Sequence, residues 1–218
     1  PHYLKQVLES LLKNDLSDID VYFFQDGAVT LSGKRVAEDK DIEECINLCN
    51  TYFPNATKII QKDNIGTALQ YDIAEKTFFV SNQYERAIFF EDDLVVLPNY
   101  IKNLKYIFDK YKDDDRISLI SAYGEAWDNS LSKQWENSQK IAPMEHHWGF
   151  GITRKFWEKR QPIVEEYLEL IRGIEYRESN KGKVPEWLKN YGFRYSCCSQ
   201  DFAKQVAALK LNKVRITC

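Results

Sequence analysis

The sequence predicts a mixed α/β fold with a mainly parallel central sheet flanked by helices. In residues 1–121, short apolar runs that are typical of buried strands alternate with segments whose apolar residues recur every three or four positions, as on one face of a helix. Such alternation is typical of strands joined by crossover helices. The chain has 218 residues, of which 44% are hydrophobic, and this length suits one well-packed domain. We therefore expect a single domain over residues 1–218.

The elements of the first half follow from this spacing. Apolar residues between Leu4 and Leu12 predict a helix, although a sheet of this kind ordinarily begins with a strand. We therefore expect that a first strand is missing and that the chain is part of a longer polypeptide. The later strands are expected at residues 19–24, 58–61, 87–90 and 117–121. The later helices are expected at residues 42–49, 69–79 and 100–111.

The pattern changes after residue 121. Loops rich in Trp, Asn, Ser and Gly come first, and three helices and one strand are expected after them. The helices are expected at residues 154–160, 163–172 and 200–209, and the strand at residues 213–217. No repeat or low-complexity linker separates the two halves, so the second half is expected to form a lid and a floor on the first.

Charge and hydropathy exclude two classes of partner. Thirty Lys and Arg residues against 33 Asp and Glu residues give a formal net charge of −3, without the basic excess that neutralises nucleic-acid phosphates. No apolar stretch approaches the ~20 residues that cross a bilayer. We therefore expect neither a nucleic-acid partner nor a transmembrane segment.

The five cysteines favour a reducing compartment over a disulfide framework. Their number is odd, and the neighbours Cys197 and Cys198 would bridge each other only with backbone strain. Cys45 and Cys49 share one face of a predicted helix, where buried packing is favoured over half of a zinc site.

Three consecutive acids, Glu91, Asp92 and Asp93, follow the predicted strand at residues 87–90. Adjacent carboxylates at the tip of a buried strand repel one another and lose solvent, and a bound cation would relieve both effects. Carboxylate oxygens suit Mg²⁺ or Mn²⁺, and a substrate phosphate ordinarily completes such a site. Ligands of open α/β sheets bind at this end of the strands. A metal site is therefore favoured over the alternative, a solvated acidic turn.

Several short motifs stand in an order that carries more information than any one of them. They are Phe24-Gln25-Asp26-Gly27, Asn64-Ile65-Gly66, Phe90-Glu91-Asp92-Asp93-Leu94, Trp148-Gly149-Phe150-Gly151 and Ser199-Gln200-Asp201. The set resembles the glycosyltransferases of the GT-A fold, a Rossmann-like fold of nucleotide-sugar transferases. It is most similar to bacterial family 2-like enzymes and to the N-acetylglucosaminyltransferases that branch N-glycans. The resemblance extends over most of the chain.

The resemblance implies a hexosyl- or N-acetylhexosaminyltransferase, as in polysaccharide biosynthesis. Such an enzyme would transfer a sugar from a nucleoside diphosphate sugar, with a UDP-sugar favoured, to a hydroxyl of a glycan or glycoconjugate acceptor. The transfer would invert the anomeric centre and would use Mn²⁺ or Mg²⁺ as a Lewis acid. Residues 1–121 would bind the nucleotide, and residues 122–218 would bind the donor sugar and the acceptor.

The resemblance also implies roles on the nucleotide side. Asp26 would accept a hydrogen bond from the base, Asp92 would reach the ribose hydroxyls, and Asp93 would bind the metal ion. Asn64 and Gly66 would shape the nucleotide pocket. Turn roles explain Asp26, Asn64 and Gly66 about equally well, because Asp, Asn and Gly all favour turns.

On the acceptor side, the resemblance makes Asp201 the base that deprotonates the attacking hydroxyl. Its place at the start of a predicted helix favours an ionised carboxylate, and a helix N-cap is the alternative role. Trp148 and Gly149 would line the donor sugar, and His147 is the histidine preferred for a contact with phosphate or metal. The reserve acids for the base are Glu125, Asp128 and Glu145.

Two other functions stay open. A nucleotidyltransferase shares the acidic metal site but needs a Gly-rich basic loop, which the sequence lacks. A catalytically silent domain that binds glycans or proteins could use the five tryptophans. A cytoplasmic enzyme associated with a membrane-held acceptor is the expected setting, and a glycosylation sequon at Asn55 keeps the Golgi lumen open.

Overall fold

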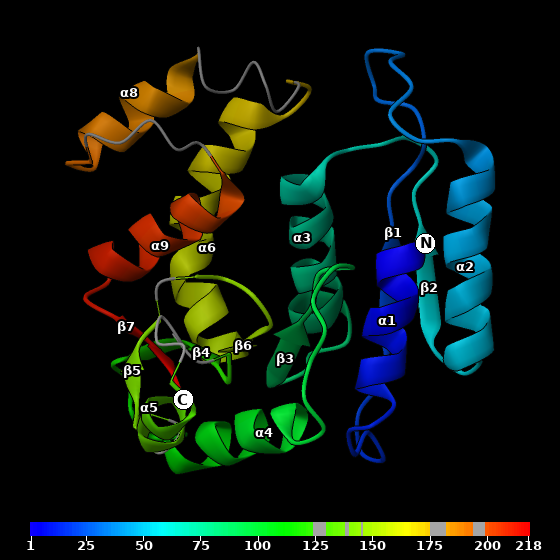
Figure 1. Ribbon diagram of the computed structural model, residues 1–218. Coiled ribbons are helices and arrows are strands. Elements are labelled where there is room, and N and C mark those ends of the chain that lie inside the picture. Colours follow the sequence, from blue (N-terminus) through cyan, green and yellow to red (C-terminus); the bar gives the residue numbers. More distant parts are fainter. Residues whose placement is uncertain (124–129, 138–139, 145, 175–181, 194–198) are drawn as a thin grey trace.

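A computed structural model of the chain describes residues 1–123, 130–137, 140–144, 146–174, 182–193 and 199–218 (Figure 1). Helices and strands alternate as in a mixed α/β fold, which confirms the coarse prediction. Among these residues, no helix has the length and apolarity needed to cross a membrane.

The strands form two sheets. β1 (Tyr22–Gln25) and β2 (Thr57–Ile60) make a parallel pair. The larger sheet has the strand order β3 (Arg86–Phe89), β6 (Phe150–Thr153), β4 (Ile117–Ser121), β7 (Val214–Thr217) and β5 (Ala142–Pro143). Within the described residues, β1 and β3 each keep one edge without a strand partner. Strands from the second half of the chain are thus built into the sheet of the first half.

The larger sheet is mixed, so the prediction of a mainly parallel sheet is wrong for it. β6 runs antiparallel to both β3 and β4, β5 runs antiparallel to β7, and β4 pairs with β7 in parallel. The error comes from residues 148–151, because two glycines there predicted a loop against a ligand. Gly151 instead lies within β6, opposite Ile88 of β3 and Ile120 of β4.

Most helices lie where the apolar spacing predicts them. The helices are α1 (His2–Leu11), α2 (Asp39–Tyr52), α3 (Thr67–Lys76), the π-helical turn η1 (Thr77–Ser81), α4 (Tyr100–Lys110), α5 (Leu131–Asn137), α6 (Arg154–Ile171), α8 (Lys183–Asn190) and α9 (Gln200–Lys210). α5 and α8 have no counterpart in the prediction, and α6 is one helix where two are expected. α6 continues through Pro162, which removes one backbone donor, because Val164, Tyr167 and Leu168 bury its next turns.

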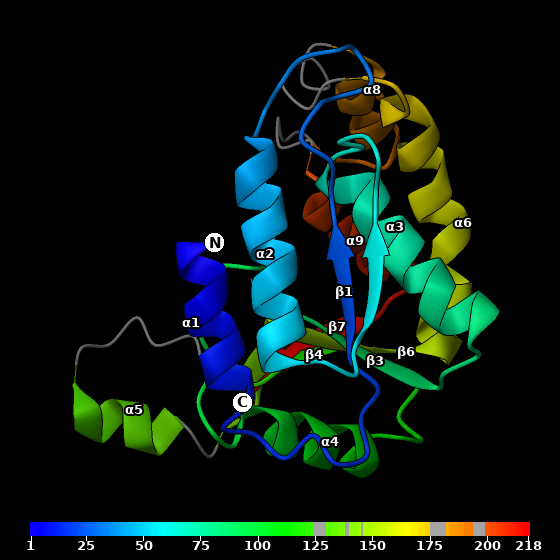
Figure 2. The ribbon, with the colours of Figure 1, turned by 90° about the vertical axis from the view of Figure 1, so that its right-hand side faces the viewer.

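Helices cover both faces of the larger sheet (Figure 2). α4 lies on one face, where Phe108 packs in a cluster with Ile120 of β4. α3, α6 and α9 lie on the other face, where Phe156 of α6 packs in a cluster with Leu119 of β4. Leu119 and Ile120 serve opposite layers because successive side chains of a strand point to opposite faces.

α1 and α2 pack against the two-stranded sheet. Leu8 of α1 forms a buried cluster with Cys49 and Phe53, and Phe23 of β1 packs against that cluster. Burial raises the pKa of the Cys49 thiol to about 11. The packing role expected for this cysteine is therefore confirmed.

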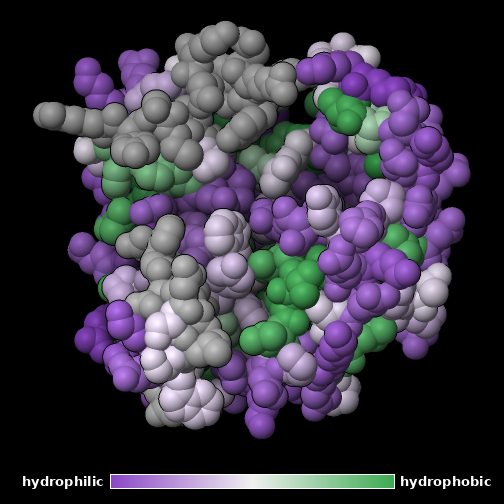
Figure 3. Space-filling view, in the orientation of Figure 1, coloured by the Kyte–Doolittle hydropathy of each residue, from purple (hydrophilic) through white to green (hydrophobic). Residues whose placement is uncertain are grey.

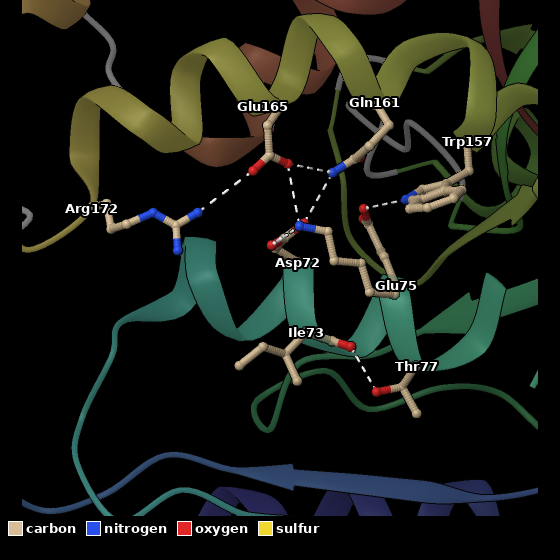
Figure 4. Close-up of polar contacts among 9 residues, drawn as sticks. Asp72, Ile73, Glu75, Thr77, Trp157, Gln161, Glu165 and Arg172 are labelled. Carbon is tan, nitrogen blue, oxygen red and sulfur yellow. Dashed lines mark hydrogen bonds and ion pairs between the residues drawn. The ribbon is translucent and has the colours of Figure 1, made fainter. Parts of the chain in front are cut away.

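A polar seam joins α3 to α6 (Figure 4). Lys76 Nζ on α3 lies 2.8 Å from Asp72 Oδ2 and 3.3 Å from Glu165 Oε2 on α6. Gln161 of α6 donates to Asp72 at 3.0 Å and to Glu165 at 3.2 Å. Arg172 Nη2 lies 3.5 Å from Glu165 Oε1. The seam fixes how these two helices lie against each other.

Gly151→Ala should destabilise the sheet. A Cβ at Gly151 would lie 2.6 Å from Phe108 Cζ and 3.0 Å from Ile120 Cγ1. Overpacking of this kind costs about 1–3 kcal/mol, which urea denaturation would measure as a lower free energy of unfolding. Gly182→Ala is the matched control, because nothing lies within 4 Å of its new Cβ. Equal losses in the two variants would contradict this account of the packing.

Candidate functional site

The candidate site lies at the edge of the larger sheet that its strand ends form, and not along the side of an outer strand. β3, β4 and β7 end at this edge, and β6 begins there because it runs antiparallel to β3 and β4. Phe150, the first residue of β6, pairs with Phe89 of β3 and with Ser121 of β4. The acidic segment after β3 therefore lies beside Trp148 and Gly149, which precede β6.

Tyr100 holds these two segments together. Its hydroxyl donates to the Gly149 carbonyl at 2.5 Å, and Ser121 Oγ donates to the Trp148 carbonyl at 3.3 Å. Gly149 has a φ of +54°, and a Cβ there would lie 2.7 Å from Tyr100 Oη and 2.8 Å from Leu94 Cδ2. Glycine is needed for this backbone conformation and this close approach. The structure therefore brings the predicted donor-sugar residues next to the acidic segment.

α1 anchors the segment between β3 and α4 from the other side. Ser10 Oγ accepts a hydrogen bond from Val96 N, and Asn14 Oδ1 accepts one from Ile101 N, each at 3.1 Å. Both side chains are buried, and Asn14 lies just beyond the end of α1. Hydrogen bonds to α1 and to the turn after it thus fix the backbone that follows the three acids.

The same segment exposes apolar side chains to solvent. Val95 is 55% exposed and Leu97 is 78% exposed. Figure 3 shows hydrophobic surface near the centre of this face, over the segment between β3 and α4, with polar surface around it. The acids therefore stand beside apolar surface.

Acids from two distant parts of the sequence share the site. Burial, and then the negative charges of Asp201, Asp93 and Asp92, raise the pKa of the Glu91 carboxyl to about 7. Burial and the carboxylates of Glu91 and Asp201 raise the pKa of Tyr71, on α3, well above its ordinary value. Charges shift a pKa in this way when they lie close together. The predicted metal ligand and the predicted base therefore lie around one centre.

This excess of negative charge fits a divalent cation. In the part of the chain that the structure describes, no group of three His, Cys, Asp or Glu side chains could hold a metal ion by itself. Asp93 is exposed, so an ion bound to it would be completed by water and by phosphate oxygens, as Mg²⁺ commonly is. Such an ion would neutralise the repulsion that Glu91 experiences.

Asp201 lies in the first turn of α9 but is not its N-cap. Ser199 is the cap, and its side chain accepts a backbone hydrogen bond at 3.3 Å. The capping role left open for Asp201 is therefore wrong. Burial raises the pKa of Asp201, and the positive charges of Lys204 and Arg215 oppose that shift. Gln200 donates a hydrogen bond to Asp201 Oδ1.

Asp26, Asn64 and Gly66 form a braced turn beyond β1. Asp26 Oδ1 accepts from Ile65 N at 2.8 Å, and its Oδ2 accepts from Gly66 N at 2.9 Å. Asn64 Nδ2 donates to the Gly27 carbonyl at 3.1 Å. Gly66 is the N-cap of α3 and has a φ of +83°. The turn roles are therefore confirmed, and the nucleotide roles of these three residues stay predictions.

Three aromatic rings lie together at the edge, close to Gly149. Trp148 stacks on His146 with ring centroids 5.2 Å apart and an interplanar angle of 18°. Tyr123 meets both rings edge-on, at 5.1 Å from His146 and 5.5 Å from Trp148. Trp148 is 48% exposed. An exposed ring of this kind can pack against the apolar face of a sugar.

His147 points into the core. It is 5% exposed, and its Nε2 has no hydrogen-bond partner among the described residues. Burial, and then the positive charges of Arg215, Lys204 and Arg160, lower its pKa well below the ordinary value. Because the ring is buried, a contact of His147 with phosphate or metal, which the sequence left as the less favoured alternative, gains no support from the structure.

Lys204 and Tyr71 are the residues near the acids that the sequence analysis misses. Lys204 is buried on α9 between Ala203 and Val206, which are buried as well. A charged residue on the apolar face of a predicted helix is the signal that could have found it. The reserve acids Glu125, Asp128 and Glu145 lie outside the described residues.

Comparison with known proteins gives no family for the chain. No family model matches it, and no curated protein is significantly similar to it. The functional argument therefore depends on the geometry and charges of the site.

His147→Gln should reduce the loss of stability in mild acid. Burial lowers the pKa of this ring in the folded protein well below the value of about 6.5 at which it is protonated in the unfolded chain. From pH 7.5 to pH 5.5, His147 should therefore lower the free energy of unfolding of the wild type by about 1.4 kcal/mol, and the variant should lack this contribution. Urea denaturation at the two pH values measures it.

His2→Gln is the matched control, because His2 is an exposed histidine of α1. It should lose as much stability as the wild type between the two pH values. An identical pH dependence of wild type and His147→Gln would show that His147 is protonated in the folded protein.

Proposed function

We propose that this protein is a metal-dependent glycosyltransferase of the GT-A type. It transfers a sugar from a nucleoside diphosphate sugar, with a UDP-sugar favoured, to a hydroxyl of a glycan or glycoconjugate, with inversion. The observation that carries the proposal is the gathering of Glu91, Asp93 and Asp201 around Tyr71 beyond the end of β3. Ligands of open α/β sheets bind at such an edge.

The nucleotide lies, in this proposal, between the braced turn and the acids. Asp93 would hold Mn²⁺ or Mg²⁺, which would supply charge neutralisation for the leaving diphosphate, and the exposed Asp92 would reach the ribose. Tyr71 is five residues beyond Gly66, or about 8 Å along α3 at 1.5 Å per residue. This separation leaves room for the nucleobase near Asp26 and for the diphosphate near Asp93.

Asp201 serves the acceptor in this proposal. Its carboxylate takes the proton of the acceptor hydroxyl while that oxygen bonds to the anomeric carbon. The bond from the anomeric carbon to the diphosphate oxygen breaks, and the diphosphate leaves with the electron pair. Lys204 and Arg215 favour the ionised form that this role needs. Trp148 offers an exposed ring for a sugar at the same edge.

Glycan binding without transfer is the second candidate, and the exposed rings of Trp148 and Tyr123 favour it. Nucleotidyl transfer gains less support, because the sequence lacks the Gly-rich basic loop that would hold a triphosphate. The unpaired edges of β1 and β3 are compatible with the extra first strand that the resemblance implies. A cytoplasmic enzyme near a membrane-held acceptor is the proposed setting, with the Golgi lumen as the alternative.

One nucleoside diphosphate should raise Tm only when Mn²⁺ is present. A panel of UDP, GDP, CDP and ADP, each with and without Mn²⁺, would be measured by thermal shift. Saturation at a hundredfold excess over Kd adds ~2.7 kcal/mol to the free energy of unfolding. For a domain of this size the rise in Tm is roughly 5–10 °C. UDP is the nucleotide expected to give it.

Asp93→Ala should abolish that rise. Asp113→Ala is the matched control and should retain it, because Asp113 is exposed in the turn before β4, at the opposite edge of the sheet. The absence of any nucleotide-dependent shift, both in this chain and in a longer chain with the expected first strand, would contradict the proposal.

Asp201→Asn should lower kcat by about 10²–10⁴-fold, since the amide cannot take the acceptor proton. Nucleotide binding should survive in this variant, and the thermal-shift panel would show that. Transfer would be measured as release of the nucleoside diphosphate from the donor that the panel identifies. Full activity of Asp201→Asn would remove this residue from the role of base.

A further inference from the structure

A buried ion cluster lies beneath the acids of the site. Arg160 Nη2 of α6 lies 2.6 Å from Glu75 Oε1 of α3, and Lys204 Nζ of α9 lies 3.0 Å from the same oxygen. The three side chains are at most 3% exposed. Trp157 Nε1 donates to the other Glu75 oxygen at 3.1 Å (Figure 4). One buried carboxylate thus serves two buried cations from two other helices.

The charges of this cluster do not balance within it. Glu75 contributes one negative charge, and Arg160 and Lys204 contribute two positive charges when Lys204 is protonated. Lys204 Nζ also lies 4.1 Å from the ring centroid of Tyr71, as an ammonium does in a cation–π contact. Burial of an unbalanced charge is costly, so a further negative group nearby is expected to offset it.

Asp201 stands where it can be that group. It precedes Lys204 by three residues on α9, and residues three apart in a helix lie on the same side. Tyr71, which Lys204 contacts, is also the residue around which Glu91 and Asp201 gather. The buried cluster and the acidic edge are therefore adjacent layers that meet at Lys204.

We propose that Lys204 is a positioning residue whose buried ammonium keeps the Asp201 carboxylate ionised and oriented for its role. The inference rests on the proposed function only in naming Asp201 as the base. Glu75 and Arg160 in turn hold the ammonium in place from α3 and α6. This arrangement of Lys204, Glu75 and Arg160 lets the half-buried Asp201 carboxylate stay charged inside an acidic cluster.

Groups from every neighbouring element act on Asp201. Burial and Glu91 favour its protonated form, and Lys204 and Arg215 favour its ionised form. The titratable and charged groups around Asp201 and its neighbour Lys204 are Tyr71 and Glu75 on α3, Glu91 and Asp93 after β3, Arg160 on α6 and Arg215 on β7. Lys204 is the cation of α9 that lies one turn from Asp201, so its removal gives the most direct test.

The test is a pH titration of the Asp201 carboxyl in the full chain. The side-chain carboxyl signals are monitored by ¹³C NMR. Asp201→Asn assigns the signal. Lys204→Met retains the Glu75–Arg160 pair and removes only the ammonium, so the midpoint of Asp201 should rise by about one pH unit or more. Lys204→Arg keeps the charge and should restore a midpoint near that of the wild type.

Lys210→Met is the matched control, because Lys210 lies in the last turn of the same helix and is exposed. It should leave the midpoint of Asp201 unchanged. If Lys204→Met does not fold, Lys204→Gln gives the same test, because it removes the positive charge and keeps a polar group beside Glu75, so the midpoint should again rise. A midpoint that moves in neither variant would overturn the inference.

The outcome separates this inference from the proposed function. If the titration of Asp201 moves as stated and no nucleotide sugar is turned over, the charge device stands and glycosyl transfer fails. If transfer is found, the acidic limb of the pH profile of kcat/KM should move to higher pH in Lys204→Met by the shift that NMR measures. A limb that stays in place while the NMR midpoint moves would show that Asp201 is not the base.

Discussion

The two ion pairs that Glu75 makes at once, with Arg160 and with Lys204, constrain the rest of the structure. Each partner comes from a different helix, and none of the three charges has access to solvent. Removing one partner of a buried pair ordinarily costs about 3–5 kcal/mol, because the other charge is left unpaired. α3, α6 and α9 must therefore dock in one arrangement. The turn at the start of α3 and the acid at the start of α9 take their positions from it.

The candidate site is a boundary between two layers of opposite charge. Arg160, Lys204 and the one carboxylate of Glu75 lie inside, with an excess of positive charge, and the other carboxylates lie outside, beyond the ends of the strands. Either layer alone would be unstable, because like charges repel and buried charges lose water. Placed against each other, they allow Asp201 and the acids after β3 to share a small volume. For the proposed enzyme, this arrangement keeps negative charge available for a metal ion without protonating the base.

Local patterns predict the elements well where the contacts are local. The strand at residues 117–121 and the helix after Pro98 lie where the apolar spacing places them. The sequence analysis does not predict β6, because its glycines suggest a loop that contacts a ligand. In the structure these glycines make room for nearby side chains, among them Tyr100 and Phe108 of α4. The role of Lys204 is not predicted, because its counter-ion, Glu75, is distant in sequence. The acids after β3 are visible in the sequence, but whether they lie close to Asp201 depends on how α9 docks.

The strand order also determines when this sheet can form during synthesis. β4 lies between β6 and β7, and β3 pairs with β6, so the partners of both strands lie later in the chain. Until β6 has left the ribosome, β3 and β4 have no strand of the larger sheet to pair with, and their apolar residues stay open to misassociation. The half of the chain that carries the three acids thus cannot complete the larger sheet by itself. Its sheet closes late, through pairings between distant residues that slow folding.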